Sequence, residues 1–240
     1  MKAIKTITIA ALCILALSAC ARYTSSEKRP AGVTAKDVNE ASYMIGYNFG
    51  QFISGNKMGA LNLAMIDKGI KDACKGVKID DEEFMNVMDG YMDKIRTALK
   101  ETNAAEAETF FAKNRDAEGV FTTESGLQYK IVREGSGAYP AADDKVEVNY
   151  EGSLLDGTIF ESSFESGQPV QFGLNQVIKG WGEGLQYINE GGEIILWIPA
   201  ELAYGEYGAG AAIGPNQALK FRVELLSIIK DEEPAAGENN

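Results

Sequence analysis

Val177-Ile178-Lys179-Gly180-Trp181 is the stretch of sequence that decides the fold of the C-terminal half. Two apolar residues lead through a glycine onto a tryptophan, and residues 180–187 have the pattern of a short amphipathic helix. A tyrosine flanked by small residues follows in Ala203-Tyr204-Gly205. Neither segment contains a nucleophile, a metal ligand or a phosphate-binding loop. If the two segments meet in space, they form an aromatic pocket with one hydroxyl, which suits the binding of an apolar ring.

Strand-like segments lie on both sides of this stretch and are separated by glycine-rich turns. They cover residues 127–132, 146–154, 193–198 and 219–229. Apolar and polar residues alternate at the start of the second segment, which is typical of a half-buried antiparallel strand. The pattern predicts an α+β domain over residues 119–230, in which a twisted antiparallel sheet wraps around the short helix.

Several longer strings are distributed through this domain. They are Val146-Glu147-Val148-Asn149-Tyr150-Glu151-Gly152, Asp156-Gly157-Thr158-Ile159-Phe160-Glu161-Ser162-Ser163, Val177-Ile178-Lys179-Gly180-Trp181, Ile198-Pro199, Leu202-Ala203-Tyr204-Gly205, Ile213-Gly214-Pro215-Asn216 and Leu219-Lys220-Phe221-Arg222-Val223-Glu224-Leu225-Leu226. Their joint spacing resembles that of FKBP-type peptidyl-prolyl cis–trans isomerases over residues 125–230. The resemblance implies an enzyme that binds a proline ring and rotates the preceding peptide bond.

The resemblance also implies a set of site residues, with no cofactor and no metal ion. The catalytic set is Tyr150, Phe160, Glu161, Tyr204 and Phe221, and the substrate-binding set is Phe172, Val177, Ile178, Trp181 and Ile213. Trp181 would form the floor under the proline ring, and Ile213 would lie in an overhanging loop. The Tyr204 hydroxyl and the Ile178 backbone N–H would donate hydrogen bonds to substrate carbonyls. The residues by themselves leave a second interpretation open, because tryptophan and tyrosine usually belong to the core of a small α+β domain.

Two positions depart from the pattern of the family. Glu161 stands where aspartate is usual, and its extra methylene could misplace a carboxylate that orients the pocket. Val170 stands where an aromatic wall is common, which predicts a shallower pocket on that side. We expect a folded, competent site with lower catalytic efficiency or an altered preference for the residue before proline.

A helical region over residues 34–118 precedes this domain. Apolar residues recur at spacings of three and four from Val38 to Phe52 and again from Phe84 to Ala98. Residues 101–108, rich in alanine and glutamate, extend the last helix as a spacer that we expect to cross solvent. An apolar stripe that extends beyond its own core predicts a homodimer through this region. A monomeric bundle with an internal stripe is the alternative.

The string Ser42-Tyr43-Met44-Ile45-Gly46-Tyr47 and the long last helix add a second resemblance. They are similar to the N-terminal domain of exported bacterial isomerases of the macrophage infectivity potentiator type. This resemblance implies that helices of two chains entwine into a V-shaped homodimer with an isomerase domain at each tip.

The first residues have the pattern of a bacterial lipoprotein signal. Two lysines precede an apolar run over residues 7–17 that is too short to span a bilayer, and Leu17-Ser18-Ala19-Cys20 resembles a lipobox. This pattern predicts a signal peptide over residues 1–19, a lipid on the thiol of Cys20, and a flexible tether over residues 20–33. An ordinary secretory signal and an uncleaved membrane anchor are the alternatives.

Charge and cysteine content exclude several classes of function. The chain carries 35 acidic and 23 basic side chains and no histidine, for a net charge of −12. This excess repels nucleic acid and anionic headgroups, so neither is an expected partner. Cys74 has no histidine base and no second cysteine left after processing, so we expect it to be buried as a small apolar residue. The acidic residues 231–240 are predicted to be a disordered tail.

Three functions agree with these patterns. The first is an isomerase that speeds X–Pro isomerisation while exported proteins fold, and the aromatic set favours it. The second is an envelope chaperone or holdase with secondary isomerase activity, and the third is a binding lipoprotein without turnover. The resemblance implies proline-containing unfolded chains or peptides as substrates and macrolides of the FK506 or rapamycin type as inhibitors. The signal predicts a lipid-anchored protein of the cell envelope, at the outer membrane and facing either the periplasm or the surface.

Overall fold

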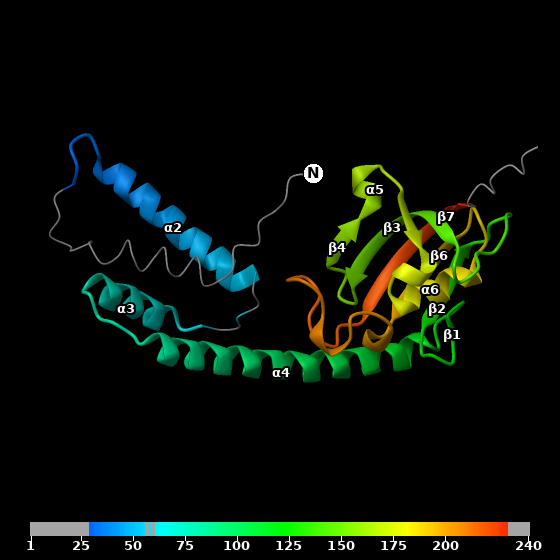
Figure 1. Cartoon of the computed structure of the whole chain (residues 1–240), viewed down its shortest axis with the longest axis horizontal. Helices are drawn as coiled ribbons and strands as arrows, with labels where there is room; N and C mark the ends of the chain where they lie inside the picture. The colour runs from blue at the N-terminus through cyan, green and yellow to red at the C-terminus, as the bar shows by residue number, and fades with distance from the viewer. Residues whose placement is uncertain (1–28, 56–57, 59–60, 230–240) are drawn as a thin grey trace, which may run out of the picture. The chain divides into compact units, whose positions relative to one another are not determined.

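The computed structural model describes residues 29–55, 58 and 61–229 (Figure 1). They form two compact units that divide between Ile95 and Arg96. The predicted signal peptide, Cys20 and the predicted tail over residues 231–240 lie outside the described residues. Within the described part of the chain, no helix is long and apolar enough to cross a bilayer. The same residues contain no cluster of three or more potential metal-ligating side chains.

The N-terminal unit consists of helices whose starts are set by side-chain caps. Its elements are α2 (Ala35–Gly55), α3 (Leu63–Cys74) and the first part of α4 (Asp81–Asn114). The Asn62 side chain accepts the backbone N–H groups of Ala64 and Met65 at the start of α3, and Asp80 accepts those of Glu82 and Glu83 at the start of α4. These bonds satisfy donors that a helix N-terminus otherwise leaves unpaired. The helical pattern of the sequence is thereby confirmed. Cys74, which was expected to be buried, is only half-buried at the end of α3.

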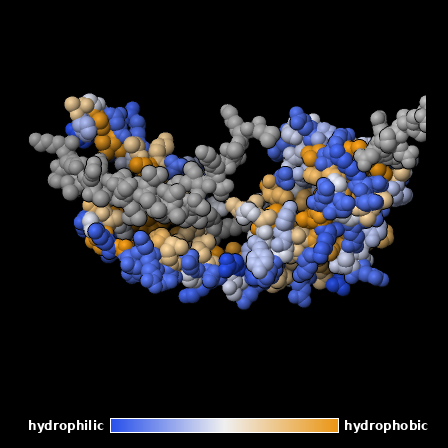
Figure 2. Space-filling model, viewed as in Figure 1, coloured by the Kyte–Doolittle hydropathy of each residue, from blue (hydrophilic) through white to orange (hydrophobic). Residues whose placement is uncertain are grey.

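The apolar side chains of this unit are largely exposed in one chain. No residue of α2 or α3 is buried, and Ile45 and Leu63 are 73% and 72% exposed. Orange, apolar surface is visible on these helices in Figure 2. Scattered exposed apolar residues are ordinary, but α2 and α3, as the structure describes them, do not form a core of their own.

One antiparallel sheet dominates the C-terminal unit. Its strands are β1 (Phe121–Thr122), β2 (Gln128–Arg133), β3 (Lys145–Leu154), β4 (Ile159–Ser162), β5 (Val170–Gly173), β6 (Glu193–Ile198) and β7 (Leu219–Ile229). The order across the sheet is β1-β2-β6-β7-β3-β4, and β5 pairs with β3. The four strands predicted from sequence are confirmed to within one residue at either end. The strands β1, β4 and β5 were not predicted, because they are only two to four residues long.

The edge of β3 changes partner along its length. Its first part, Lys145 to Val148, pairs with β5, and Glu151 to Ser153 pair with β4. The helix α5 (Ser163–Ser166) lies between these two partners in the chain. At the junction, the backbone N–H of Tyr150 donates to the hydroxyl of Ser163 at 2.8 Å, so a side chain replaces the missing strand partner.

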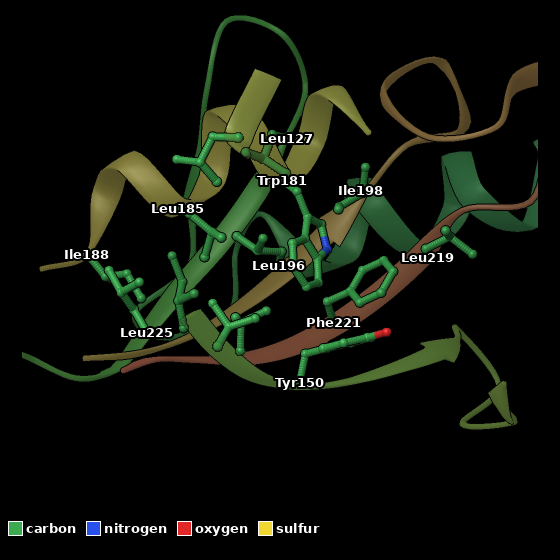
Figure 3. Packing of buried hydrophobic residues seen from close by; sticks show 14 of the residues in the cluster. Leu127, Tyr150, Trp181, Leu185, Ile188, Leu196, Ile198, Leu219, Phe221 and Leu225 are labelled. Atoms are coloured by element: carbon green, nitrogen blue, oxygen red, sulfur yellow. The ribbon is translucent and has the colours of Figure 1, made fainter. Parts of the chain in front are cut away.

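The core lies where α6 (Lys179–Gly184) packs on the sheet (Figure 3). Two glycines allow α6 to approach β6 directly. A Cβ at Gly180 would lie 2.4 Å from Ile198, and one at Gly184 would lie 2.6 Å from Leu196. Both β6 side chains are fully buried. Close packing of this kind fixes the position of the helix that carries Trp181.

The second half of α4 belongs to the C-terminal unit, which begins at Arg96. The Phe110 ring lies 6.5 Å from the Trp197 ring of β6, and the Gln128 side chain donates to the Phe111 carbonyl at 2.9 Å. Most residues from 101 to 108 are exposed, in accordance with the predicted spacer. Asn103 differs, because it is only 8% exposed and its side chain donates to the carbonyl of Pro215. A short polar residue in an alanine-rich segment gave no pattern that would predict this contact.

Candidate active site

Aromatic rings from α6 and three strands meet around Trp181. Tyr150 of β3, Phe172 of β5 and Phe221 of β7 all meet the indole edge-to-face, with ring centroids 5.1, 5.5 and 5.2 Å away. This is a preferred geometry for aromatic pairs, and several such contacts hold the indole in one orientation. The structure thereby brings together four of the residues that the resemblance assigned to the site.

The indole N–H of Trp181 has no hydrogen-bond acceptor among the described residues. Trp181 is 4% exposed, and Figure 3 shows its nitrogen on the side that faces Phe221. The planes of the two rings are 87° apart.

Phe160 completes the wall beside Phe221, and a glycine makes room for both rings. The two phenylalanine rings meet edge-to-face with centroids 5.8 Å apart. A Cβ at Gly152 of β3 would lie 2.7 Å from each ring. Gly152 therefore has a structural role in the site that the sequence analysis did not assign, although its string was part of the resemblance.

Glu161 lies next to Phe160 on β4 and interacts with Tyr150. Burial, a hydrogen bond to Glu161 and the charge of Glu161 all raise the pKa of the Tyr150 phenol well above its usual value. Tyr204 also raises the pKa of Tyr150, so the two side chains are close enough to interact electrostatically. The longer carboxylate side chain at this position therefore still reaches the tyrosine.

Val170 is half-buried and packs against the core, so the wall on this side begins without an aromatic ring. Phe172 lies two residues further along β5 and therefore on the same face of the sheet. Its ring is 5.9 Å from Tyr150 and 5.5 Å from Trp181. The neighbouring aromatic residue thus covers part of the side where a shallower pocket was predicted.

The remaining predicted residues lie at the start of α6 and in the loop between β6 and β7. Val177 and Ile178 are half-buried and pack against the core cluster, and the Ile178 carbonyl accepts the backbone N–H of Trp181 at 2.9 Å. Tyr204 is 42% exposed, whereas Ile213 is 7% exposed. The Tyr204 side chain is thus partly exposed, while Ile213 is held by the core.

These features define a class of protein in which an antiparallel sheet packs around a short helix. Its site consists of aromatic rings and a partly exposed tyrosine, and not of acid–base groups. Residues 137–226 match the family model of the FKBP-type peptidyl-prolyl cis–trans isomerase. Residues 38–131 match the model of the domain amino terminal to it. The chain belongs to the FKBP-type peptidyl-prolyl cis–trans isomerase family.

Individual relatives extend this similarity through both halves of the chain. A probable FKBP-type isomerase, FkpA of Neisseria meningitidis, is 40% identical over 83% of this chain and 77% of its own length. The outer membrane protein MIP of Legionella longbeachae is 34% identical over 81% of this chain and 87% of its own length. The crystal structure of FkpA from Escherichia coli covers 82% of this chain and 98% of its own, with a TM-score of 0.60 and 33% identity.

Proposed function

We infer that this chain catalyses peptidyl-prolyl cis–trans isomerisation. The observation that carries this function is the group of three aromatic rings that meet the Trp181 indole edge-to-face. One of the three, Tyr150, also interacts electrostatically with the partly exposed Tyr204. Membership of the isomerase family and the names of its relatives support the same activity.

The reaction needs a pocket more than it needs a reactive group. Rotation of a peptide bond costs about 18–20 kcal/mol because planarity maintains the double-bond character of the C–N bond. X–Pro bonds consequently isomerise over tens to hundreds of seconds. The twisted state has lost amide resonance, so its carbonyl is less dipolar and is easier to bury in an apolar site. A site that desolvates the imide and holds the proline ring therefore favours the twisted state over the planar one.

Each side chain of the site has a proposed part in this process. Trp181 supports the proline ring, and the walls come from Tyr150, Phe160, Phe172, Val177 and Phe221. The Tyr204 hydroxyl and the Ile178 N–H hold substrate carbonyls, Ile213 covers the site, and Glu161 orients Tyr150. Macrolides of the FK506 or rapamycin type would compete for the same site.

A pair of substitutions tests this assignment. Tyr204→Phe with Phe160→Ala should lower kcat/KM for a proline tetrapeptide by about a hundredfold, or about 2.7 kcal/mol of transition-state stabilisation. Tyr139→Phe, at a 58% exposed tyrosine that has no place in the proposed site, serves as the control and should leave the rate unchanged. Unaltered acceleration by the double variant would exclude this site as the catalytic one.

We propose that two chains associate through residues 34–118. The exposed apolar side chains of α2 and α3 support this proposal, because a helical unit without a buried face gains stability by packing against a partner. Sedimentation of the soluble form that begins at Ala21 should give twice the chain mass. A monomer at concentrations far above the assay range would contradict the proposal.

We propose an envelope location, with residues 1–19 as the signal peptide, a lipid on Cys20 and residues 20–33 as the tether. The relative from Legionella longbeachae is named an outer membrane protein, which supports the location. Residues 119–230 would then be the isomerase domain that reaches exported, proline-containing chains. Metabolic labelling with a fatty acid should mark the wild type and not Cys20→Ser.

A chaperone activity is a second candidate, favoured by the same exposed apolar residues of α2 and α3. It is separable from isomerisation, because the double variant at Tyr204 and Phe160 changes no residue of those helices. The variant should therefore still suppress the aggregation of an unfolded protein that lacks proline. Loss of that suppression would assign the chaperone activity to the proline site instead.

A further inference from the structure

The loop between β6 and β7, residues 199–218, carries two of the proposed site residues, Tyr204 and Ile213. It is closed internally by a bridge between Ala209 and Ile213, with hydrogen bonds of 2.9 and 3.2 Å. Gly208 has a φ of +68°, and a Cβ there would lie 2.2 Å from the Ile213 carbonyl oxygen. These bonds shape the loop but do not fix it to the rest of the domain.

A buried side chain of α4 holds one end of this loop. The Asn103 amide donates to the Pro215 carbonyl at 2.7 Å, and Asn103 is the buried residue of α4. Asn103 is separated from Pro215 by more than a hundred residues, so the bond links distant parts of the chain. Removing a buried donor leaves the carbonyl without a partner, which is more costly than the loss of an exposed contact.

Lys100, one helical turn before Asn103, holds the loop at two further points. Its ammonium group donates to Glu206 at 2.6 Å and lies 5.8 Å from the centre of the Tyr207 ring. Its carbonyl accepts the Asn216 side chain at 3.4 Å. The Asn216 backbone N–H in turn donates to the carbonyl of Gly205, the neighbour of Tyr204, at 2.9 Å.

Asn216 occupies a backbone conformation that favours glycine. Its φ is +51°, and it is the non-glycine residue with a positive φ in the described part of the chain. Asparagine tolerates this conformation better than most residues, but strain of this kind persists only where surrounding contacts hold it. The two hydrogen bonds of Asn216 are such contacts. We call Lys100, Asn103 and Asn216 the helix–loop clamp.

The part of α4 that follows the clamp is itself fixed to the sheet. The Gln128 side chain of β2 is 2% exposed, donates to the Phe111 carbonyl at 2.9 Å and accepts the Asn114 amide at 2.8 Å. Phe110 packs against Trp197 of β6. The helix is therefore a rigid support that connects β2 and β6 to the loop.

We propose that the helix–loop clamp is a positioning device for the isomerase site, with Asn103 as its principal residue. It holds the loop so that the Tyr204 hydroxyl is already in place when the proline ring enters, while Ile213 is held by its packing in the core. Preorganisation of this kind raises the turnover rate because the loop does not have to be ordered in the transition state. The proposal rests on the proposed isomerase function.

Asn103→Asp tests the clamp in the full-length protein, because it keeps the shape of the side chain and removes the donor. We expect kcat/KM for a proline tetrapeptide to fall by roughly three- to tenfold, as is typical when a coupled contact is lost. The loss should appear in kcat rather than in KM. Thr102→Ala, at the exposed neighbouring position of α4, should keep the wild-type value. Equal activity of Asn103→Asp and wild type would overturn the proposal.

A double-mutant cycle separates positioning from a general structural effect. If Asn103 acts through Tyr204, then Asn103→Asp should cost much less in a Tyr204→Phe background than in the wild type. If the double variant instead loses kcat/KM by the product of the two single losses, Asn103 acts independently of Tyr204, and the proposal is overturned.

Asn216→Gly provides the second variant in case Asn103→Asp does not fold. Glycine adopts the positive φ without strain, so this change removes only the side-chain bond to α4. We expect a loss in kcat with unchanged thermal stability, and unchanged kcat would count against the clamp. If the wild type does not accelerate isomerisation, both the proposed function and the proposed role of the clamp are wrong. If the wild type and the clamp variants are equally active, only the proposed role of the clamp is wrong.

Discussion

At the scale of single residues, the site depends on groups that keep one charge state over a wide pH range. Its proposed hydrogen-bond donors are a tyrosine hydroxyl and a backbone N–H, and the chain contains no histidine. Burial and the contact with Glu161 raise the pKa of Tyr150. A raised pKa means that the phenol stays protonated, and can still donate, at pH values where a free tyrosine already ionises.

The first prediction concerns pH. We expect kcat/KM to stay constant from about pH 6 to about pH 9, because ordinary tyrosines ionise only near 10 and the pKa of Tyr150 is higher still. The measurement is the isomerisation rate of a proline tetrapeptide across that range. A bell-shaped profile with a midpoint near neutrality would show that a titrating group outside this site takes part.

The second prediction concerns Glu161. Glu161→Leu removes the acceptor for Tyr150 and should lower kcat/KM by about tenfold, or about 1.4 kcal/mol. Glu161→Asp restores the residue usual in the family and should stay within about twofold of wild type, because the glutamate already interacts with Tyr150. A large gain from Glu161→Asp would mean that the extra methylene does impair the site.

Single residues also show which parts of the site could be predicted from the sequence and which could not. Trp181, Phe221 and Tyr150 are 4%, 4% and 7% exposed. Such values are those of ordinary core residues, so only the resemblance distinguished them from the core. The contact of Asn103 could not be predicted, because its partner, Pro215, is remote in sequence and no local pattern encodes such a pair.

At the scale of elements, the fit between α6 and β6 determines where Trp181 lies. The long strands were predictable because their apolar runs are bounded by turns, whereas β1, β4 and β5 are too short to show a period. The helix α6 was predictable as a short amphipathic segment. Its distance from the sheet was not, because that distance depends on which side chains of β6 meet its glycines.

The third prediction belongs to this contact. Gly180→Ala places a methyl group 2.4 Å from the Ile198 side chain. Overpacking of this kind costs about 1–3 kcal/mol, which exceeds the gain of about 0.5–1 kcal/mol from alanine in a helix. We expect a lower free energy of unfolding in urea and reduced isomerase activity, since Trp181 follows directly. Gly69→Ala, in α3 with no atom within 4 Å, is the matched control and should not be destabilised.

At the scale of the whole molecule, the two units have different stability requirements. The C-terminal unit has a closed core between the sheet and α6. The N-terminal unit leaves its apolar side chains exposed, so its stability should depend on protein concentration if two chains associate.

The fourth prediction follows for Ile45, which is 73% exposed in one chain. Ile45→Glu should convert a dimer into a monomer in sedimentation, because a buried unpaired carboxylate is costly at an apolar interface. Turnover of a proline tetrapeptide should be unchanged, since no site residue is altered. Lys36→Glu, which changes a charge on the same helix at an exposed position, should leave the association state intact. A dimer that persists in Ile45→Glu would place the interface elsewhere.

The change of partner along β3 has a consequence for local breathing of the sheet. Residues 149 and 150 lie between the segment paired with β5 and the segment paired with β4, and the Tyr150 amide is held there by the Ser163 hydroxyl. A single side-chain acceptor holds a backbone amide less firmly than a strand ladder does, so we expect the Tyr150 amide to exchange its proton with solvent faster than the amides of β7. We therefore expect the wall of the site beside Tyr150 to be the part of the sheet that adapts to different residues before proline, while the pairing of β3 with β7 stays intact.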